Sequence, residues 1–193
     1  MKKRQVPSPR EFASTLGQEP NELKKKLLLL GYMSNRLSDL GATLFLVGGQ
    51  AVETYTGGVF NTGDIDITTT KDQATEELLG KLGFEKEGMI WINDKLGIAV
   101  HVVSSFPRRT LKSRTIEVNG YTVKVVGVED LIVDRLAAAK FWRSERDEEQ
   151  AKALLNAFED SIDIAYLEGI AKEEMVEDFL ERLRDRKRWP QRK

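Results

Sequence analysis

Hydrophobic and polar residues alternate along the chain with two different periods, which predicts a fold of helices and strands. Over residues 21–40 the apolar positions recur every three or four residues, as in an amphipathic helix, and Gly41 ends the pattern. The apolar run 43–47 is typical of a buried strand, and two glycines follow it. Residues 1–20 hold three of the five prolines and predict a loose lead-in or a short helix.

The central part of the chain predicts further short elements. Residues 64–69 (DIDITT) alternate polar and β-branched side chains, so we expect a strand with Asp64 and Asp66 on one face. The other expected elements are a helix over 50–55, a helix over 70–82 with Thr70 and Gln73 as a capping box, strands over 84–92 and 96–105, and a hairpin of 116–118 with 121–126 around Asn119-Gly120.

The last third of the chain is expected to be helical, in segments 129–142, 147–158, 163–171 and 172–186. The whole order predicts an α+β fold, a mixed sheet with packed helices and a helical C-terminal region. We divide it into a lead-in (1–20), an α/β core (21–127) and a helical cap with a basic tail (128–193).

Composition narrows the chemistry. The 193 residues include no cysteine and one histidine, which excludes disulfides, thiol nucleophiles and zinc sites built from several Cys or His residues. The net charge of −1 combines basic ends with an acidic body. This distribution argues against a protein that binds nucleic acid over a large part of its surface. No signal peptide or membrane span is evident in the sequence, so a cytoplasmic protein is expected.

The segment 44–70 combines two features that together predict phosphate chemistry. Gly48-Gly49 end a buried strand, so backbone amides there can approach an anion, and a helix expected to begin at Gln50 would add its positive end. Asp64 and Asp66 on the next strand could share one or two Mg²⁺ ions. Alone, a Gly-Gly pair is usually a turn and an Asp-x-Asp pair a solvated strand edge. Their order and their apolar setting favour the functional interpretation.

These residues resemble the motif of the nucleotidyltransferase-fold superfamily of DNA polymerase beta. The pattern here is Gly48-Gly49, a spacer, then Asp64-Ile65-Asp66-Ile67. The chain is most similar to small bacterial and archaeal nucleotidyltransferase-like proteins related to AbiEii-type toxins, and the likeness covers roughly residues 44–158. A weaker second motif supports it: Glu129-Asp130-Leu131, Arg135-Leu136, Ala138-Ala139-Lys140 and Arg146-Asp147.

The resemblance implies Mg²⁺-dependent transfer of a nucleotide from a nucleoside triphosphate to an acceptor, with two metal ions. Asp64 and Asp66 would bind the metal, and Gly48, Gly49 and Gln50 would contact the triphosphate. Arg135 and Lys140, on the first cap helix, would lie near the nucleotide. The acceptor would be RNA or protein. Whether the protein forms a homo-oligomer stays open.

One position departs from the superfamily pattern. A third acidic residue usually follows on a later strand, and the matching position here holds His101. The imidazole is a poor Mg²⁺ ligand but could act as a general base, so we count His101 among the catalytic candidates. A satisfied core histidine and a weakened enzyme are the alternatives, and Glu117 is a fallback carboxylate.

The sequence leaves open the roles of several further basic and aromatic residues. Arg108, Arg109, Lys112 and Arg114 could steer a phosphate or lie in a solvated loop, and Trp91 and Trp142 could stack on a base or pack. The sequence thus predicts a magnesium-dependent nucleotidyltransferase with an unknown acceptor. The alternatives are a weakened nucleotide-binding protein and an interaction protein of the toxin–antitoxin type.

Overall fold

The computed structural model describes residues 6–103 and 112–185. The strands of these segments are β1 (Leu44–Val47), β2 (Asp64–Thr69), β3 (Glu85–Glu87), β4 (Ile90–Asn93), β5 (Ile98–Val102), β6 (Ser113–Val118) and β7 (Tyr121–Val126). The helices are α1 (Pro9–Leu16), α2 (Glu22–Ser38), α3 (Gly48–Tyr55), α4 (Asp72–Lys81), α5 (Val128–Phe141), α6 (Glu145–Ala157), α7 (Ile164–Glu173) and α8 (Glu177–Asp185).

Within the described residues, seven strands form one mixed sheet in the order β3-β4-β5-β2-β1-β7-β6. The central strand β2 runs antiparallel to β1 and parallel to β5. The carboxyl end of β1 therefore lies beside the beginning of β2, and Val47 is opposite Asp66. On the other side of β2, Asp66 is opposite His101. This strand order brings the predicted site residues to one place.

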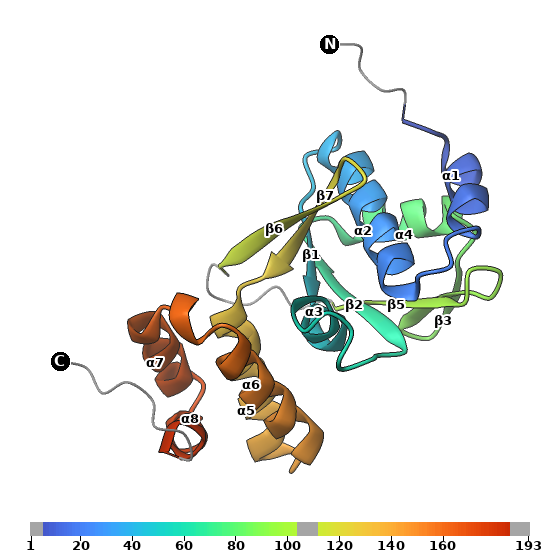
Figure 1. The fold of residues 1–193 in the computed structure, drawn as a ribbon. Coiled ribbons are helices and arrows are strands. Elements are labelled where there is room, and N and C mark those ends of the chain that lie inside the picture. Colours follow the sequence, from blue (N-terminus) through green and yellow to red (C-terminus); the bar gives the residue numbers. More distant parts are fainter. Residues whose placement is uncertain (1–5, 104–111, 186–193) are drawn as a thin grey trace.

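The helices gather in two groups around the sheet (Figure 1). Helices α1, α2 and α4 lie together on one side, where Phe12 of α1 stacks on Tyr32 of α2 with ring centroids 3.9 Å apart. Helices α5 to α8 lie next to one another beyond α3. The α+β fold predicted from the sequence is confirmed.

One cluster of buried apolar side chains joins these layers. On β2, Ile65 and Ile67 are fully buried, whereas Asp64 and Asp66 point to the other face and are partly exposed. Full burial of such an aliphatic side chain contributes about 1.5–3 kcal/mol. The alternation expected for 64–69 therefore holds over residues 64–67, whereas Thr68 and Thr69 are both buried, and it fixes which face of the strand carries the carboxylates.

Several expected boundaries were wrong. The strand expected over 84–92 is a hairpin, because Gly88 adopts a left-handed φ of 62° between β3 and β4. The helix expected to begin at residue 172 begins at Glu177, after Met175 with a φ of 57°.

The expected capping box of α4 does not form. The N-cap of α4 is Lys71, which makes no side-chain capping bond. The hydroxyl of Thr70 instead accepts a hydrogen bond from the backbone N–H of Thr43, 2.9 Å away, so it ties β1 to the end of β2. No helix in residues 6–103 or 112–185 combines the length and apolar character that a membrane crossing requires.

Candidate functional site

The backbone turn at Gly48 lies directly against the carboxylate of Asp66. Helix α3 begins at Gly48, two residues earlier than the sequence predicted, and no side chain caps it. Gly48 has a φ of 63°, and a Cβ atom there would overlap the carboxylate of Asp66. Only glycine fits both the backbone angle and the contact. The uncapped first turn of α3 and the Asp66 carboxylate therefore adjoin each other.

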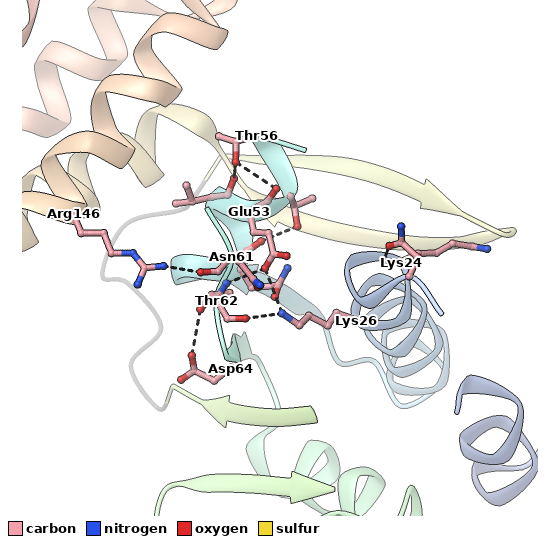
Figure 2. Close-up of polar contacts among 12 residues, drawn as sticks. Lys24, Lys26, Glu53, Thr56, Asn61, Thr62, Asp64 and Arg146 are labelled. Carbon is pink, nitrogen blue, oxygen red and sulfur yellow. Dashed lines mark hydrogen bonds and ion pairs between the residues drawn. The ribbon is translucent and has the colours of Figure 1, made fainter. Parts of the chain in front are cut away.

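The second glycine of the pair lies against Thr62, in the loop that leads into β2. A Cβ on Gly49 would approach the hydroxyl of Thr62 to 3.1 Å, which is tighter than ordinary packing. The Thr62 hydroxyl lies 3.4 Å from Oδ1 of Asp64 (Figure 2). The glycine pair thus contacts the two parts of the chain that set the positions of Asp64 and Asp66.

A buried ion pair holds this loop from the inside. Nζ of Lys26, on α2, lies 3.3 Å from Oε2 of Glu53, on α3. Lys26 also donates to the backbone carbonyl of Thr62 at 2.7 Å, and Glu53 accepts from the Thr62 backbone N–H at 3.3 Å (Figure 2). Both charges therefore face the backbone of one residue, two positions before Asp64.

The helical cap also contacts this loop. Arg146 of α6 donates from its guanidinium to the backbone carbonyl of Asn61 at 2.6 Å (Figure 2). The sequence pointed to Arg146 as part of the weaker second motif and did not identify Lys26, Glu53 or Thr62. The structure shows that Lys26, Glu53 and Arg146 all contact the loop before Asp64, to which Thr62 belongs.

His101 lies beside Asp66 on the neighbouring strand. Its Nδ1 is 3.2 Å from Oδ1 of Asp66, and the two side chains are 27 % and 24 % exposed. An ionised carboxylate at Asp66 requires the proton on Nδ1, which leaves a lone pair on Nε2. Nε2 is buried and has no hydrogen-bond partner within the described residues.

The Asp66 carboxylate lies where negative charge is disfavoured. Burial raises the pKa of Asp66 most, and the neighbouring Asp64 raises it further. The hydrogen bond from His101 and the positive charge of Arg135 act in the opposite direction. The net effect is a raised pKa, so a cation at this point would relieve an unfavourable charge.

A cavity of about 500 Å³ opens over these residues. Its wall comes from β1, β2, β5 and one side of α5, and it includes Gly48, Asp66, Thr68, His101, Arg135 and Trp142. Thr68 is 2 % exposed, and its hydroxyl has no partner among the residues that the structure describes. Asp64, Gly49, Gln50 and Lys140 do not line the cavity.

Searches against protein-family models and against curated proteins gave no match. Several solved structures are similar, among them the following two. An antigenic nucleotidyltransferase-like protein from Paracoccidioides brasiliensis aligns with a TM-score of 0.65 and 16 % identity, covering 88 % of this chain and 90 % of the other. The antibiotic-resistance factor ANT(2'')-Ia aligns with a TM-score of 0.50 and 15 % identity, covering 83 % and 92 %. The chain has a nucleotidyltransferase-like fold.

The metal expected with a nucleotidyltransferase-like fold can be tested against the donor atoms. Asp64 and Asp66 lie on one face of β2, and burial together with the charge of Asp64 raises the pKa of Asp66. Magnesium in proteins is commonly held by one or two carboxylates together with water and substrate phosphates, so one ion fits. Within residues 6–103 and 112–185 no group of three or more His, Asp or Glu side chains could hold a metal ion, which gives no support for a second ion.

Arg135 is the basic residue of the predicted set that the fold brings to the cavity. One of its guanidinium nitrogens donates to Asp147 at 2.7 Å, and the group also pairs with Asp134. Burial would lower the pKa of Arg135, but Asp134, Asp147 and Asp66 together raise it, so the charge is retained. Arg135 thus faces the cavity as a fixed positive charge.

Two other predicted residues lie elsewhere. Lys140 donates to the carbonyl of Met175 and to Asp178, at 2.7 and 2.8 Å, so it connects α5 to α8. Gln50 is fully buried in the first turn of α3, and neither atom of its amide has a partner among the described residues.

The remaining candidates also have other partners or positions. Lys112 pairs with Asp163 at 2.8 Å, and the guanidinium of Arg114 lies over the ring of Phe158, 5.0 Å from its centroid. Arg108 and Arg109 are outside the described residues. Glu117 is on the edge strand β6, three strands from β2, so it cannot join the carboxylates of β2.

Proposed function

We propose that this protein transfers a nucleotidyl group from a magnesium-bound nucleoside triphosphate to a hydroxyl on an RNA or protein acceptor. The triphosphate would lie at the first turn of α3, over Gly48 and Gly49. Asp64 and Asp66 would hold the ion, and Arg135 would face the phosphates. Gln50 and Lys140 have no part in the proposal, because Gln50 is fully buried and Lys140 is bonded to Met175 and Asp178.

The contact between Gly48 and Asp66 is the observation that carries this proposal. An uncapped helix start favours a phosphate, because its first N–H groups are free and its dipole is positive there. A carboxylate pair at the same point would repel that phosphate unless a cation lay between them. Only a ligand that contains both, such as a magnesium-bound triphosphate, satisfies the two groups together.

The chemical step assigns a task to each group. Bound Mg²⁺ would polarise the α-phosphate and offset the charge that develops on it. The acceptor hydroxyl attacks the α-phosphorus, and the bond to pyrophosphate breaks with its electron pair on the departing oxygen. The hydroxyl proton passes to Nε2 of His101, whose other nitrogen is held by Asp66 at 3.2 Å.

The second candidate is a protein that binds the nucleotide without turning it over. His101 supports it, because this residue occupies the position where the superfamily pattern expects a third carboxylate. No group of three acidic or histidine side chains that could hold a metal ion forms in the described parts of the chain. In this case the cavity would recognise nucleotide and the product would not form.

Label transfer and calorimetry with the purified protein separate the two functions. We expect magnesium-dependent binding of ATP and transfer of label from α-labelled nucleotides to total RNA or protein, both lost in Asp64→Asn and Asp66→Asn. The control is Asp94→Asn, an exposed aspartate after β4. Binding without transfer supports the second candidate. Transfer that survives both site variants contradicts the assigned site.

A further inference from the structure

Trp142 is a large aromatic side chain that lines the cavity and yet is 81 % exposed. A tryptophan left in water at the end of a helix forgoes the burial that usually stabilises it. The sequence left open whether Trp142 packs or stacks, and this exposure excludes a packing role. The indole therefore presents a free aromatic face at the site that holds Gly48 and Asp66.

Helix α5 places this indole at a set distance from the basic group of the cavity. Trp142 follows Arg135 by seven residues, so the two side chains leave the helix on nearly the same side, about 10 Å apart along its axis. Asp130, Val133 and Ala137 complete the side of α5 that lines the cavity. One helix side thus carries the guanidinium of Arg135 and, two turns later, an aromatic surface.

The backbone fixes Trp142 at the end of α5. The backbone N–H of Trp142 donates to the carbonyl of Ala138 at 3.0 Å, and this bond completes the last helical turn. Arg143 follows with a φ of 57°, a conformation that costs a non-glycine residue free energy, and it turns the chain into α6. The strained residue stops the helix immediately after the indole and leaves the indole at the rim.

The charges of the cavity show which part of a nucleotide reaches Trp142. Asp134 and Glu174 line the wall contributed by the cap, and Asp134 offsets the charge of Arg135, with which it pairs. The phosphates are favoured at Gly48, where α3 begins without a side-chain cap. The exposed indole therefore suits a neutral, flat group attached to the triphosphate.

We infer that Trp142 is a stacking platform for the nucleobase of the bound nucleoside triphosphate. This inference rests on the proposed function and adds a base subsite to it. Stacking uses the π face that all bases share, so the four nucleoside triphosphates should bind within a few-fold of one another, purines more tightly than pyrimidines.

Two probes distinguish this inference from the proposed function. Magnesium-bound tripolyphosphate carries the phosphates without a base, and magnesium-bound ATP carries both. In calorimetric titrations of the full chain, Trp142→Ala should weaken ATP binding by about 10-fold, equal to about 1.4 kcal/mol, and leave tripolyphosphate binding unchanged. Trp142→Phe should keep most of the ATP affinity, and ATP should quench tryptophan emission in the wild type more than in this variant.

The matched control is Phe141→Ala, because Phe141 is also exposed, is adjacent in sequence and does not line the cavity. It should leave both affinities unchanged. Equal ATP affinity in Trp142→Ala and wild type, with both probes bound, overturns the base subsite and leaves the proposed function standing. Failure of both probes to bind the wild type overturns the proposed function itself, and the base subsite with it.

Discussion

Lys26 and Glu53 form an ion pair in the interior of the protein, with 3.3 Å between Nζ and Oε2 and side chains 7 % and 6 % exposed. Both charges also bond to the backbone of Thr62. Removing two charges from water is costly, and the attraction between them repays that cost only when further hydrogen bonds satisfy both groups. The backbone of Thr62 supplies those bonds, so the pair and the loop before Asp64 stabilise each other.

Breaking this pair should destabilise the fold and disturb the site. Lys26→Met leaves Glu53 buried without its partner, and we expect the free energy of unfolding in urea to fall by about 3–5 kcal/mol. The double variant Lys26→Met, Glu53→Leu should recover much of that stability, because no lone charge remains. It should still bind magnesium-bound ATP more weakly than wild type. Strictly additive losses would show that the two side chains do not act as a pair.

The outer contact of the loop should matter for binding more than for stability. Arg146→Ala removes the bond to the Asn61 carbonyl at an exposed position, so the free energy of unfolding should change by less than about 1 kcal/mol. The affinity for magnesium-bound ATP should fall several-fold, because the loop leading to Asp64 loses its contact with α6. Lys152→Ala, an exposed basic residue on the same helix, is the control. If Arg146→Ala and Lys152→Ala bound magnesium-bound ATP equally tightly, Arg146 would have no role in the site.

Gly48 and Gly57 offer a matched comparison, since both have a φ of 63°. An added Cβ at Gly57 meets no atom within 4 Å, whereas at Gly48 it would overlap Asp66. Gly57→Ala should cost only the backbone strain, about 1–2 kcal/mol of unfolding free energy. Gly48→Ala should cost about 1–3 kcal/mol more and abolish nucleotide binding. Equal costs in thermal unfolding would contradict the described contact.

The raised pKa of Asp66 predicts that this carboxylate lowers stability when no metal is present. The native state holds its proton more tightly than the unfolded chain does, so the cost is absent below the ordinary value of 3.8 and develops as the pH rises past it. In EDTA at pH 7, the free energy of unfolding in urea should therefore be about 1 kcal/mol higher for Asp66→Asn than for wild type. The difference should shrink toward pH 4, and a constant or reversed difference would refute this account.

Local patterns in the sequence predicted most elements, and the errors have local causes. The period-2 alternation was confirmed over residues 64–67, and the Asn119-Gly120 turn was confirmed with φ of 48° and 82°. Gly88 and Met175 both adopt left-handed angles within runs that looked continuous, and neither break has a strong signal in the surrounding residues. Thr70 was assigned to the wrong partner, because the backbone of Thr43 reaches it only through strand pairing.

The candidate site was predictable where its parts are neighbours through strand pairing. The antiparallel step from β1 to β2 joins Gly48 to Asp66, and the resemblance to the superfamily pattern pointed to His101, which strand pairing places beside Asp66. The Lys26–Glu53 pair was missed because its members and Thr62 lie far apart in sequence. One signal existed: Lys26 precedes Leu30 by one helical turn and so lies on the buried side of α2.

The contact between His101 and Asp66 leads to the prediction that separates the two candidate functions. If Nε2 of His101 accepts the acceptor's proton, His101→Gln should lower the rate of label transfer by about 10²–10⁴-fold. The affinity for magnesium-bound ATP should stay within about twofold, because the amide can still donate to Asp66. His101→Asp should be equally slow in transfer, since it places an acid where the base stood.

The weakened-enzyme alternative predicts the opposite order. There His101→Asp would supply an oxygen donor beside Asp66, so the affinity for Mg²⁺ and the rate of transfer would both rise above wild type. His101→Gln would then change neither quantity. The rates of the three proteins at saturating ATP, measured together with their affinities, therefore decide whether His101 is the base of this site or the residue that disables it.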